Sequence, residues 1–186
     1  MRKRIGFMLA AALAIVLSAG FLTPRPAAAA SDVKIDREVD AALANLYAGS
    51  PQAKALADKA RGILVFPRVY KAGLFFGGHY GEGSLRVAGK TVGYYDTTAV
   101  SYGLQAGAQY YGYVLFFMTD AGLSYLDQSG GWEIGVGPSI VVVDQGMASS
   151  MTSTTTQSDI YAFIFNQKGL MAGLGLQGSK IHKFTP

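Results

Sequence analysis

The sequence contains no cysteine and only two histidines among its 186 residues. Without cysteine the chain cannot form a disulfide, bind a metal through thiolates, attack a substrate with a thiol or carry a lipid on an N-terminal cysteine. The two histidines, His79 and His182, lie far apart, and no set of histidines and carboxylates has the spacing of a zinc or iron site. No nucleophile elbow of a hydrolase is visible either. We therefore expect a protein with no metal, no cofactor and no enzymatic activity.

One pattern with a chemical meaning has a simpler explanation. Residues 173–178 match the glycine pattern of dinucleotide-binding loops, which require a following helix and a distal acidic residue. Only the tail 179–186 follows, and this tail contains no acidic residue. The match is therefore accidental, and we expect no nucleotide site.

An excess of charge is also missing once the N-terminal segment is set aside. The formal net charge of +4 equals the four cations within the first 30 residues, Arg2, Lys3, Arg4 and Arg25. The rest of the chain is formally neutral. Its charge therefore gives no support for nucleic-acid binding, and any affinity for anions must come from a local patch.

The N-terminal segment has the layout of a secretory signal peptide. A positive start precedes an uncharged apolar run over residues 5–22, and prolines then lead into the small residues 27–30. We expect cleavage after Ala30, which divides the chain into a signal peptide (residues 1–30) and one domain (residues 31–186). The mature protein would be exported to the periplasm or the periphery of the outer membrane. The alternative is an uncleaved anchor, because an apolar run of this length is at the lower limit for spanning a bilayer.

What the chain has in abundance is glycine and aromatic residues, with 24 Gly, 11 Tyr and 10 Phe. Most of them lie between Gly62 and Phe184. Glycine lets sheet backbones approach closely, and large rings fill the space between them. This composition favours a rigid binding scaffold over a reaction centre.

Hydrophobic periodicity predicts helices first and strands afterwards. Apolar residues recur with helical spacing from Val39 to Tyr47, and Ser50-Pro51 predicts the start of a second short helix that stops at Gly62. The predicted strands cover residues 63–66, ending at Pro67, then residues 71–87 as one long strand or a bent pair, and residues 91–95, 99–118, 132–143, 160–166 and 170–176, with a short helix after Thr119. We expect an α+β fold: an N-terminal helical hairpin followed by a curved, mostly antiparallel β-sheet that could be partly closed.

A cluster of cations surrounds the first predicted strand. Lys54, Lys59, Arg61, Arg68 and Lys71 lie within a short stretch that contains a single acidic residue. Several of these side chains could emerge on one rim of the sheet, next to exposed aromatic residues. Such a rim would attract lipid phosphates, at about 1 kcal/mol per cation near an anionic membrane. The alternative is a solvated surface that keeps a neutral protein soluble.

Four blocks of the sequence resemble those of the SYLF-domain family. They lie at residues 61–67 together with 71–83, at residues 101–109 with a Gly-x-Gln-x-Gly pattern, at residues 135–138 and at residues 168–173. Each block alone would be a weak signal, but four blocks in the family's order are specific. The similarity extends from about Ala53 to Ile181.

The resemblance implies lipid binding. SYLF domains of animals and yeast associate with phosphoinositide membranes, and yeast members also contact actin. Bacterial members are mostly exported proteins with a suspected affinity for phospholipid. For an exported bacterial member, the partner would be an anionic phospholipid or a membrane surface, with phosphatidylglycerol, cardiolipin or lipid A as the available anions.

We therefore predict a lipid-binding site on the basic rim beside the aromatic strand. The phosphate contacts would be Arg61, Arg68, Lys71 and Lys168, and the apolar side would be lined by Phe75, Phe76 and Tyr80. Core packing is the alternative role for the three aromatic residues. The alternative function is a structural or interaction scaffold of the cell envelope, or a small barrel associated with the outer membrane.

Overall fold

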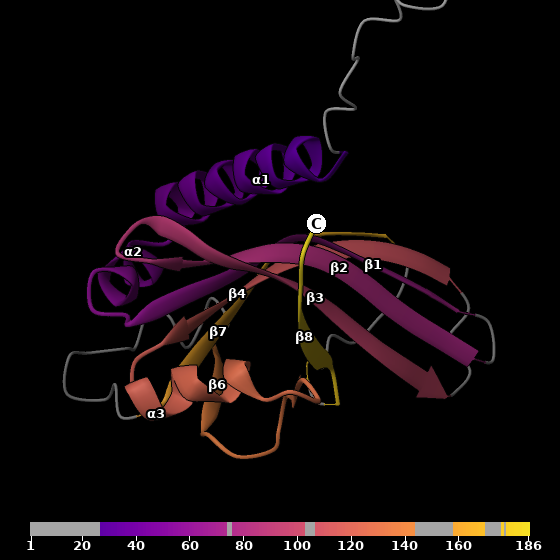
Figure 1. Ribbon diagram of the computed structural model, residues 1–186. Helices are drawn as coiled ribbons and strands as arrows, with labels where there is room; N and C mark the ends of the chain where they lie inside the picture. The colour runs from indigo at the N-terminus through magenta and orange to yellow at the C-terminus, as the bar shows by residue number, and fades with distance from the viewer. Residues whose placement is uncertain (1–26, 74–75, 103–106, 144–157, 170–175, 177) are drawn as a thin grey trace, which may run out of the picture.

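The computed structural model describes residues 27–73, 76–102, 107–143, 158–169, 176 and 178–186 (Figure 1). The helices are α1 (Ala27–Gly49), α2 (Pro51–Ala57), α3 (Asp120–Leu123) and the short 3-10 helix η1 (Ser124–Asp127). The strands are β1 (Gly62–Gly73), β2 (Phe76–Val87), β3 (Lys90–Tyr102), β4 (Gly107–Phe117), β5 (Trp132–Glu133), β6 (Ile140–Val143), β7 (Ile160–Gly169) and β8 (Lys180–Phe184).

The eight strands form one sheet in the order β5-β8-β3-β2-β1-β4-β7-β6. Neighbouring strands are antiparallel except β6 and β7, which run parallel. The sheet curls into a half-barrel. The helix α1 lies over one face, which we call the outer face, and α3 lies on the side of the other, inner face (Figure 1). The prediction of a curved, mostly antiparallel sheet is confirmed, and the predicted N-terminal helical hairpin stays a prediction.

Strand β1 passes through Pro67 instead of ending there. The pairing register of β1 shifts between Val65 and Arg68 against β2, and between Phe66 and Val69 against β4. Such shifts mark a β-bulge, in which residues are left outside the hydrogen-bond ladder. Pro67 lies inside the bulge and is paired with no residue of β2 or β4. Its missing N–H therefore removes no hydrogen bond between the strands. The prediction that the strand stops at Pro67 is therefore wrong, and the residues predicted from 71 to 87 divide between β1 and β2.

The bulge also changes which residues of β1 face inward. Before the bulge, Leu64 and Phe66 belong to the inner core, whereas after it Val69 does. Side chains alternate between the faces along a strand. From Arg68 onward, the even-numbered residues of β1 therefore face outward and the odd-numbered residues face inward.

The inner face carries the larger core. Buried residues from distant strands meet there, among them Tyr113 on β4, Ile160 on β7 and Ile181 on β8. Trp132 on β5 closes this core, and its indole N–H donates to the carbonyl oxygen of Val136 at 2.9 Å. The curl of the sheet is what brings these strands together around one core.

The outer core lies beneath the helices. Val39 and Leu46, on the predicted apolar face of α1, are buried in one cluster with residues of β1, β4, β6 and β7. Ser50 then caps α2, because its hydroxyl accepts a hydrogen bond from the Ala53 N–H at 3.2 Å, and Pro51 takes the first position of the helix. The predicted apolar face of the first helix and the predicted start of the second are confirmed.

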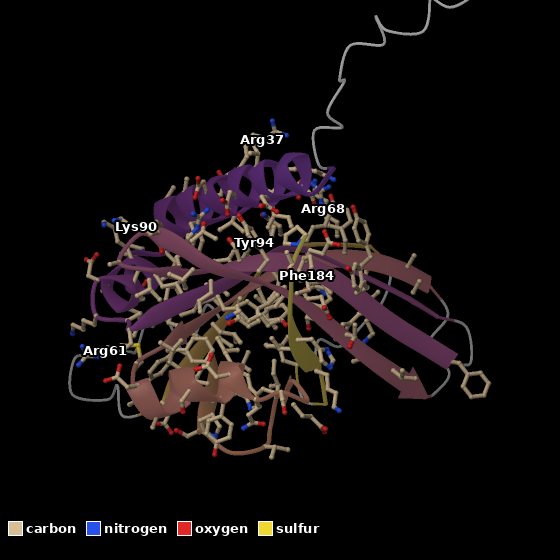
Figure 2. The ribbon with its side chains drawn as sticks, in the orientation of Figure 1. Arg37, Arg61, Arg68, Lys90, Tyr94 and Phe184 are labelled. Atoms are coloured by element: carbon tan, nitrogen blue, oxygen red, sulfur yellow. The ribbon has the colours of Figure 1, made fainter. Side chains whose placement is uncertain are left out.

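Asp36 fixes α1 to the sheet. Its carboxylate accepts hydrogen bonds from Thr91 Oγ1 at 2.9 Å and from Tyr94 OH at 3.1 Å, and it lies 3.3 Å from Arg86 Nη2. The Arg86 side chain, only 12% exposed, also contacts Asp40 Oδ1 at 2.8 Å. Burial and the bond to Asp36 raise the pKa of Tyr94 to about 12, so this phenol remains a donor. Figure 2 shows Tyr94 in the space beneath α1.

Gly83 lies where two strands approach closely. A Cβ atom at this position of β2 would overlap the backbone carbonyl oxygen of Val65 on β1. The bulge beside Val65 presses the two backbones together, and only a residue without a side chain fits. Here the glycine content of the sequence has the structural role that we expected.

Candidate functional site

Three tyrosines form one row across the outer face. Tyr70 on β1 lies directly opposite Tyr80 on β2 and Tyr110 on β4. Residues that are opposite each other in antiparallel strands point to the same face with about 5 Å between their Cβ atoms. The Tyr70 and Tyr110 ring centroids lie 6.4 Å apart. We call these three residues the tyrosine row.

A lysine stands at each end of the tyrosine row. Lys168 on β7 pairs with Tyr110. At the other end, Tyr80 pairs with Thr98 on β3, and Thr98 pairs with Lys180 on β8. Both lysines are exposed. Because neighbouring strands are about 4.8 Å apart, the row with its two lysines extends over roughly 24 Å.

The tyrosine row belongs to an exposed aromatic and apolar surface. Tyr70 is 56% exposed and Tyr80 is 49% exposed, and Phe76 and Val100 on the same face are each 71% exposed. Contiguous apolar surface of this kind marks a site of contact with a protein or a membrane. Tyrosine suits a membrane interface because its ring is apolar and its hydroxyl is polar.

Arg68 lies on the same face, two residues before Tyr70. Its Nη1 donates to Tyr70 OH at 3.4 Å, and its Cζ lies 6.0 Å from the centroid of the Tyr110 ring. The hydrogen bond to Tyr70 raises the pKa of the guanidinium above its usual value, which favours the charged form. An exposed guanidinium next to two rings can offer paired donors to a phosphate group.

Acidic residues moderate the positive charge near Arg68. Glu82 on β2 lies directly opposite Arg68 on β1, and it accepts a hydrogen bond from Tyr80 OH at 2.7 Å. Burial and this hydrogen bond raise the pKa of Tyr80 to about 12, so the phenol stays neutral. The outer face therefore combines separated cations with acids, in contrast to a uniformly basic patch.

A pocket of about 200 Å³ lies between α1 and the tyrosine row. Its lining residues are Ser31, Lys34, Ile35 and Glu38 from α1, and Pro67, Arg68, Tyr70, Tyr80, Gly81 and Glu82 from the sheet. Two cations and two carboxylates therefore surround the pocket together with two phenol rings. These groups can hold a polar head group next to the exposed aromatic surface.

Four of the predicted site residues lie on the outer face. They are Arg68 on β1, Phe76 and Tyr80 on β2, and Lys168 on β7. Cross-strand pairing through Tyr70 and Tyr110 brings them onto one surface, although they are far apart in the sequence.

The other predicted cations lie elsewhere, so the expectation of a single basic rim is wrong. Lys71 is three residues from Arg68, and an odd separation along a strand places the two side chains on opposite faces. Arg61 precedes β1 and lies far from Arg68 at the other end of the strand, as Figure 2 shows, with its Nε 3.8 Å from Asp120 Oδ1. Phe75 lies outside the described residues.

Sequence reasoning missed Tyr70, Tyr110 and Lys180. The signal was present, because Tyr70 and Tyr80 are equidistant in sequence from position 75, and they pair with each other. Treating residues 71–87 as a possible single strand concealed that symmetry. Tyr110 and Lys180 required the strand order, which no local pattern contains.

The part of the chain that the structure describes offers neither a metal site nor a spanning helix. Across these ranges, no three residues among the histidines and carboxylates are grouped so that they could hold a metal ion. The described helices are also too short or too polar to cross a bilayer.

Comparison with known protein families gives a match over part of the chain. Residues 98–185 match the family model Ysc84, described as a Las17-binding protein actin regulator. This range begins near the end of β3 and contains Tyr110, Lys168 and Lys180. It confirms the resemblance to the SYLF family, whose first sequence block lies ahead of the matched range. No curated protein matches the chain.

Proposed function

We propose that the chain, whose residues 98–185 match the Ysc84 family model, is a non-enzymatic protein that binds anionic phospholipid membranes with its outer face. Arg68 and Lys168 contact lipid phosphates. The tyrosine row and Phe76 lie at the interface between the head groups and the acyl chains.

The observation that carries the proposal is the combination of exposed rings and cations in one cross-strand row. Tyr70 and Tyr80 are about half exposed, and a lysine stands at each end of the row. Rings that are left in water gain from burial at a membrane interface, at roughly 25 cal/mol per Å² of apolar surface. The cations supply the preference for anionic lipid.

The expected size of this preference follows from the charges. Arg68, Lys168 and Lys180 would contribute about 1 kcal/mol each near an anionic surface. Glu38 and Glu82 oppose part of that attraction. A preference of roughly ten- to a hundred-fold for anionic over neutral vesicles is therefore expected, because about 1.4 kcal/mol corresponds to a factor of ten.

The compartment is part of the same proposal. We propose an exported protein that acts in the periplasm or at the periphery of the outer membrane, where phosphatidylglycerol, cardiolipin or lipid A supplies the anions. Helix α1 begins at Ala27, so the predicted cleavage position after Ala30 lies within its first turn. The division into residues 1–30 and 31–186 stays a prediction.

Vesicle flotation of residues 31–186 tests the proposal. The protein is expected to float with vesicles that contain phosphatidylglycerol and to remain largely unbound with neutral phosphatidylcholine vesicles. The double variant Arg68→Glu with Lys168→Glu should weaken binding to anionic vesicles by about tenfold or more, because it reverses two charges next to the tyrosine row.

A matched control reverses the same number of charges elsewhere. Lys59→Glu with Arg61→Glu changes two exposed cations that precede β1. Arg61 lies far from Arg68 (Figure 2). This control should bind anionic vesicles almost as the unchanged protein does after correction for net charge. Equal binding to neutral vesicles, no binding, or an equal loss in both double variants would refute the proposal.

A second candidate function is an interaction scaffold of the cell envelope. It is favoured by the family description, which names binding to a protein. The exposed surface around Phe76 and Val100 would then receive a protein partner instead of a bilayer. This candidate would be supported if the folded, monodisperse protein bound neither anionic nor neutral vesicles.

A further inference from the structure

A second row of polar side chains lies on the inner face, directly behind the tyrosine row. Lys71 on β1 is paired with His79 on β2 and with Gln109 on β4. On the next strands outward, His79 pairs with Ala99 on β3 and Gln109 pairs with Gly169 on β7. Three polar side chains therefore stand side by side on adjacent strands, between two small residues. We call His79, Lys71 and Gln109 the inner row.

Two members of the inner row, His79 and Gln109, are buried with polar atoms that have no hydrogen-bond partner among the described residues. Gln109 is 4% exposed and His79 is 8% exposed. Neither atom of the Gln109 amide has a hydrogen-bond partner, and His79 Nε2 has none either, within the part of the chain that the structure describes. Native proteins pair nearly all of their buried polar groups, so unpaired groups in one row call for an explanation.

The protonation of His79 follows from its surroundings. Burial and the nearby charge of Lys71 lower the pKa of His79 to about 4, so the imidazole is neutral near neutral pH. Burial raises the pKa of Tyr111 to about 12, and its hydroxyl lies 3.4 Å from His79 Nδ1. When Tyr111 donates to Nδ1, the proton of the ring belongs on Nε2, which is then a donor.

Donors consequently outnumber acceptors in the inner row. The ammonium group of Lys71, the Nε2–H of His79 and the amide NH₂ of Gln109 are donors. His79 Nδ1 is already occupied by the Tyr111 hydroxyl, so the Gln109 carbonyl oxygen is the one acceptor that remains. The row also carries one positive charge. Its chemical complement is a compact, negatively charged group with several oxygen acceptors.

We propose that the inner row of His79, Lys71 and Gln109 binds a phosphate group, either as the free ion or as the head of a phospholipid. Lys71 supplies the charge, and the two buried side chains supply directed hydrogen bonds. This site is independent of the outer face, because its three side chains point to the opposite side of β1, β2 and β4.

Imidazole NMR tests the site directly, because the chain contains only two histidines. Nitrogen-15-labelled protein is titrated near neutral pH with inorganic phosphate and, separately, with dihexanoyl phosphatidic acid below its micelle concentration. Sodium chloride at equal ionic strength is the blank. We expect a saturable change in the signals of His79, while those of His182 on β8 serve as the internal reference.

Three variants assign the response to the row. Lys71→Gln and Gln109→Leu should each weaken the apparent affinity by about tenfold or more, because each removes a hydrogen bond to a charged ligand. Lys90→Gln, which removes an exposed cation at the start of β3, should leave the titration unchanged. Circular dichroism of each variant confirms that it is folded, and two independent variants guard against the failure of one.

The outcomes distinguish a free phosphate ion from a lipid head group, and they also show whether the proposal is correct. Saturation by inorganic phosphate identifies a free ion as ligand, and saturation by the short lipid alone identifies a head group. Absence of saturation with both probes, or an unchanged response in Lys71→Gln, overturns the proposal. Vesicle flotation tests Arg68 and Lys168 on the outer face, whereas the NMR titration tests the inner row. Either proposal can therefore be refuted without refuting the other.

Discussion

Gln109 and Thr97 are both buried on the inner face, but their polar atoms are paired differently. Thr97 is fully buried and accepts a hydrogen bond from Tyr113 OH at 2.7 Å. Gln109 is almost as deeply buried, and its amide has no partner. A buried polar group without a partner costs about 1–3 kcal/mol, whereas a paired one stabilises the fold modestly. Comparing the two residues therefore isolates the effect of pairing.

In phosphate-free buffer, Gln109→Leu should raise the free energy of unfolding by about 1–3 kcal/mol, because it replaces an unpaired amide with an apolar side chain of similar size. Thr97→Val should lower the free energy of unfolding by a similar amount, because it leaves the Tyr113 hydroxyl unpaired. Urea unfolding of both variants measures the difference. A loss of stability in Gln109→Leu comparable to that in Thr97→Val would show that the amide is paired in solution.

Among the elements, β1 shows what the sequence could predict and what it could not. Alternating glycines and rings correctly predicted a sheet, and the cations around Gly62 directed the site prediction to this strand. The bulge at Pro67 could not be predicted, because a bulge depends on the partner strands β2 and β4. Without it, Arg68 was not placed on the same strand as Lys71, so the alternation that puts these two side chains on opposite faces was not applied, and a single rim was expected.

The predicted strand over residues 132–143 shows a second limit. The structure divides it into β5 and β6, which belong to opposite edges of the sheet. Between them, Gly135 and Gly137 adopt positive φ angles of 104° and 93°, a conformation that favours glycine and interrupts a strand. The alternation of apolar residues was real, but the two glycines redirect the chain. Residues 170–175, where another strand was predicted, lie outside the described residues.

The attachment of α1 to the sheet should depend on Asp36 more than on any exposed ion pair. Asp36→Ala removes the acceptor of Thr91 and Tyr94 and one of the two carboxylates at Arg86. We expect a loss of about 1–3 kcal/mol in the free energy of unfolding and faster hydrogen exchange in α1.

The control for this prediction is Lys54→Ala in α2. Lys54 and Asp58 form an ion pair at 3.8 Å whose side chains are 63% and 68% exposed. Solvent screens such a pair, so its removal should change stability by only a few tenths of a kcal/mol. If both variants lose the same amount, Asp36 does not have the anchoring role assigned to it.

For the molecule as a whole, His79 couples stability to pH. Its pKa is lowered to about 4 in the folded protein, by burial and by Lys71, and Tyr111 is its other neighbour with a titratable group. In the unfolded chain the pKa of histidine is about 6.5. As the pH falls below that value, the unfolded chain takes up a proton that the folded protein does not bind. Stability should therefore decline between about pH 6.5 and pH 4.

Urea unfolding near pH 7 and near pH 5 measures this effect. The unchanged protein should have a lower urea midpoint at the lower pH, and His79→Gln should lose most of that difference because it cannot take up a proton. His182→Gln, a substitution on β8, should retain it. An equal pH dependence in the protein and in His79→Gln would show that other groups cause the decline.

The two rows occupy adjacent positions on the same three strands, so that Tyr70, Tyr80 and Tyr110 each neighbour a member of the inner row. Sliding these strands by a single residue would turn the arrangement inside out, hiding the phenols and presenting the amine, imidazole and amide to the surroundings. The bulge at Pro67 therefore determines that the phenols lie on the outer face and that the amine, imidazole and amide lie on the inner face.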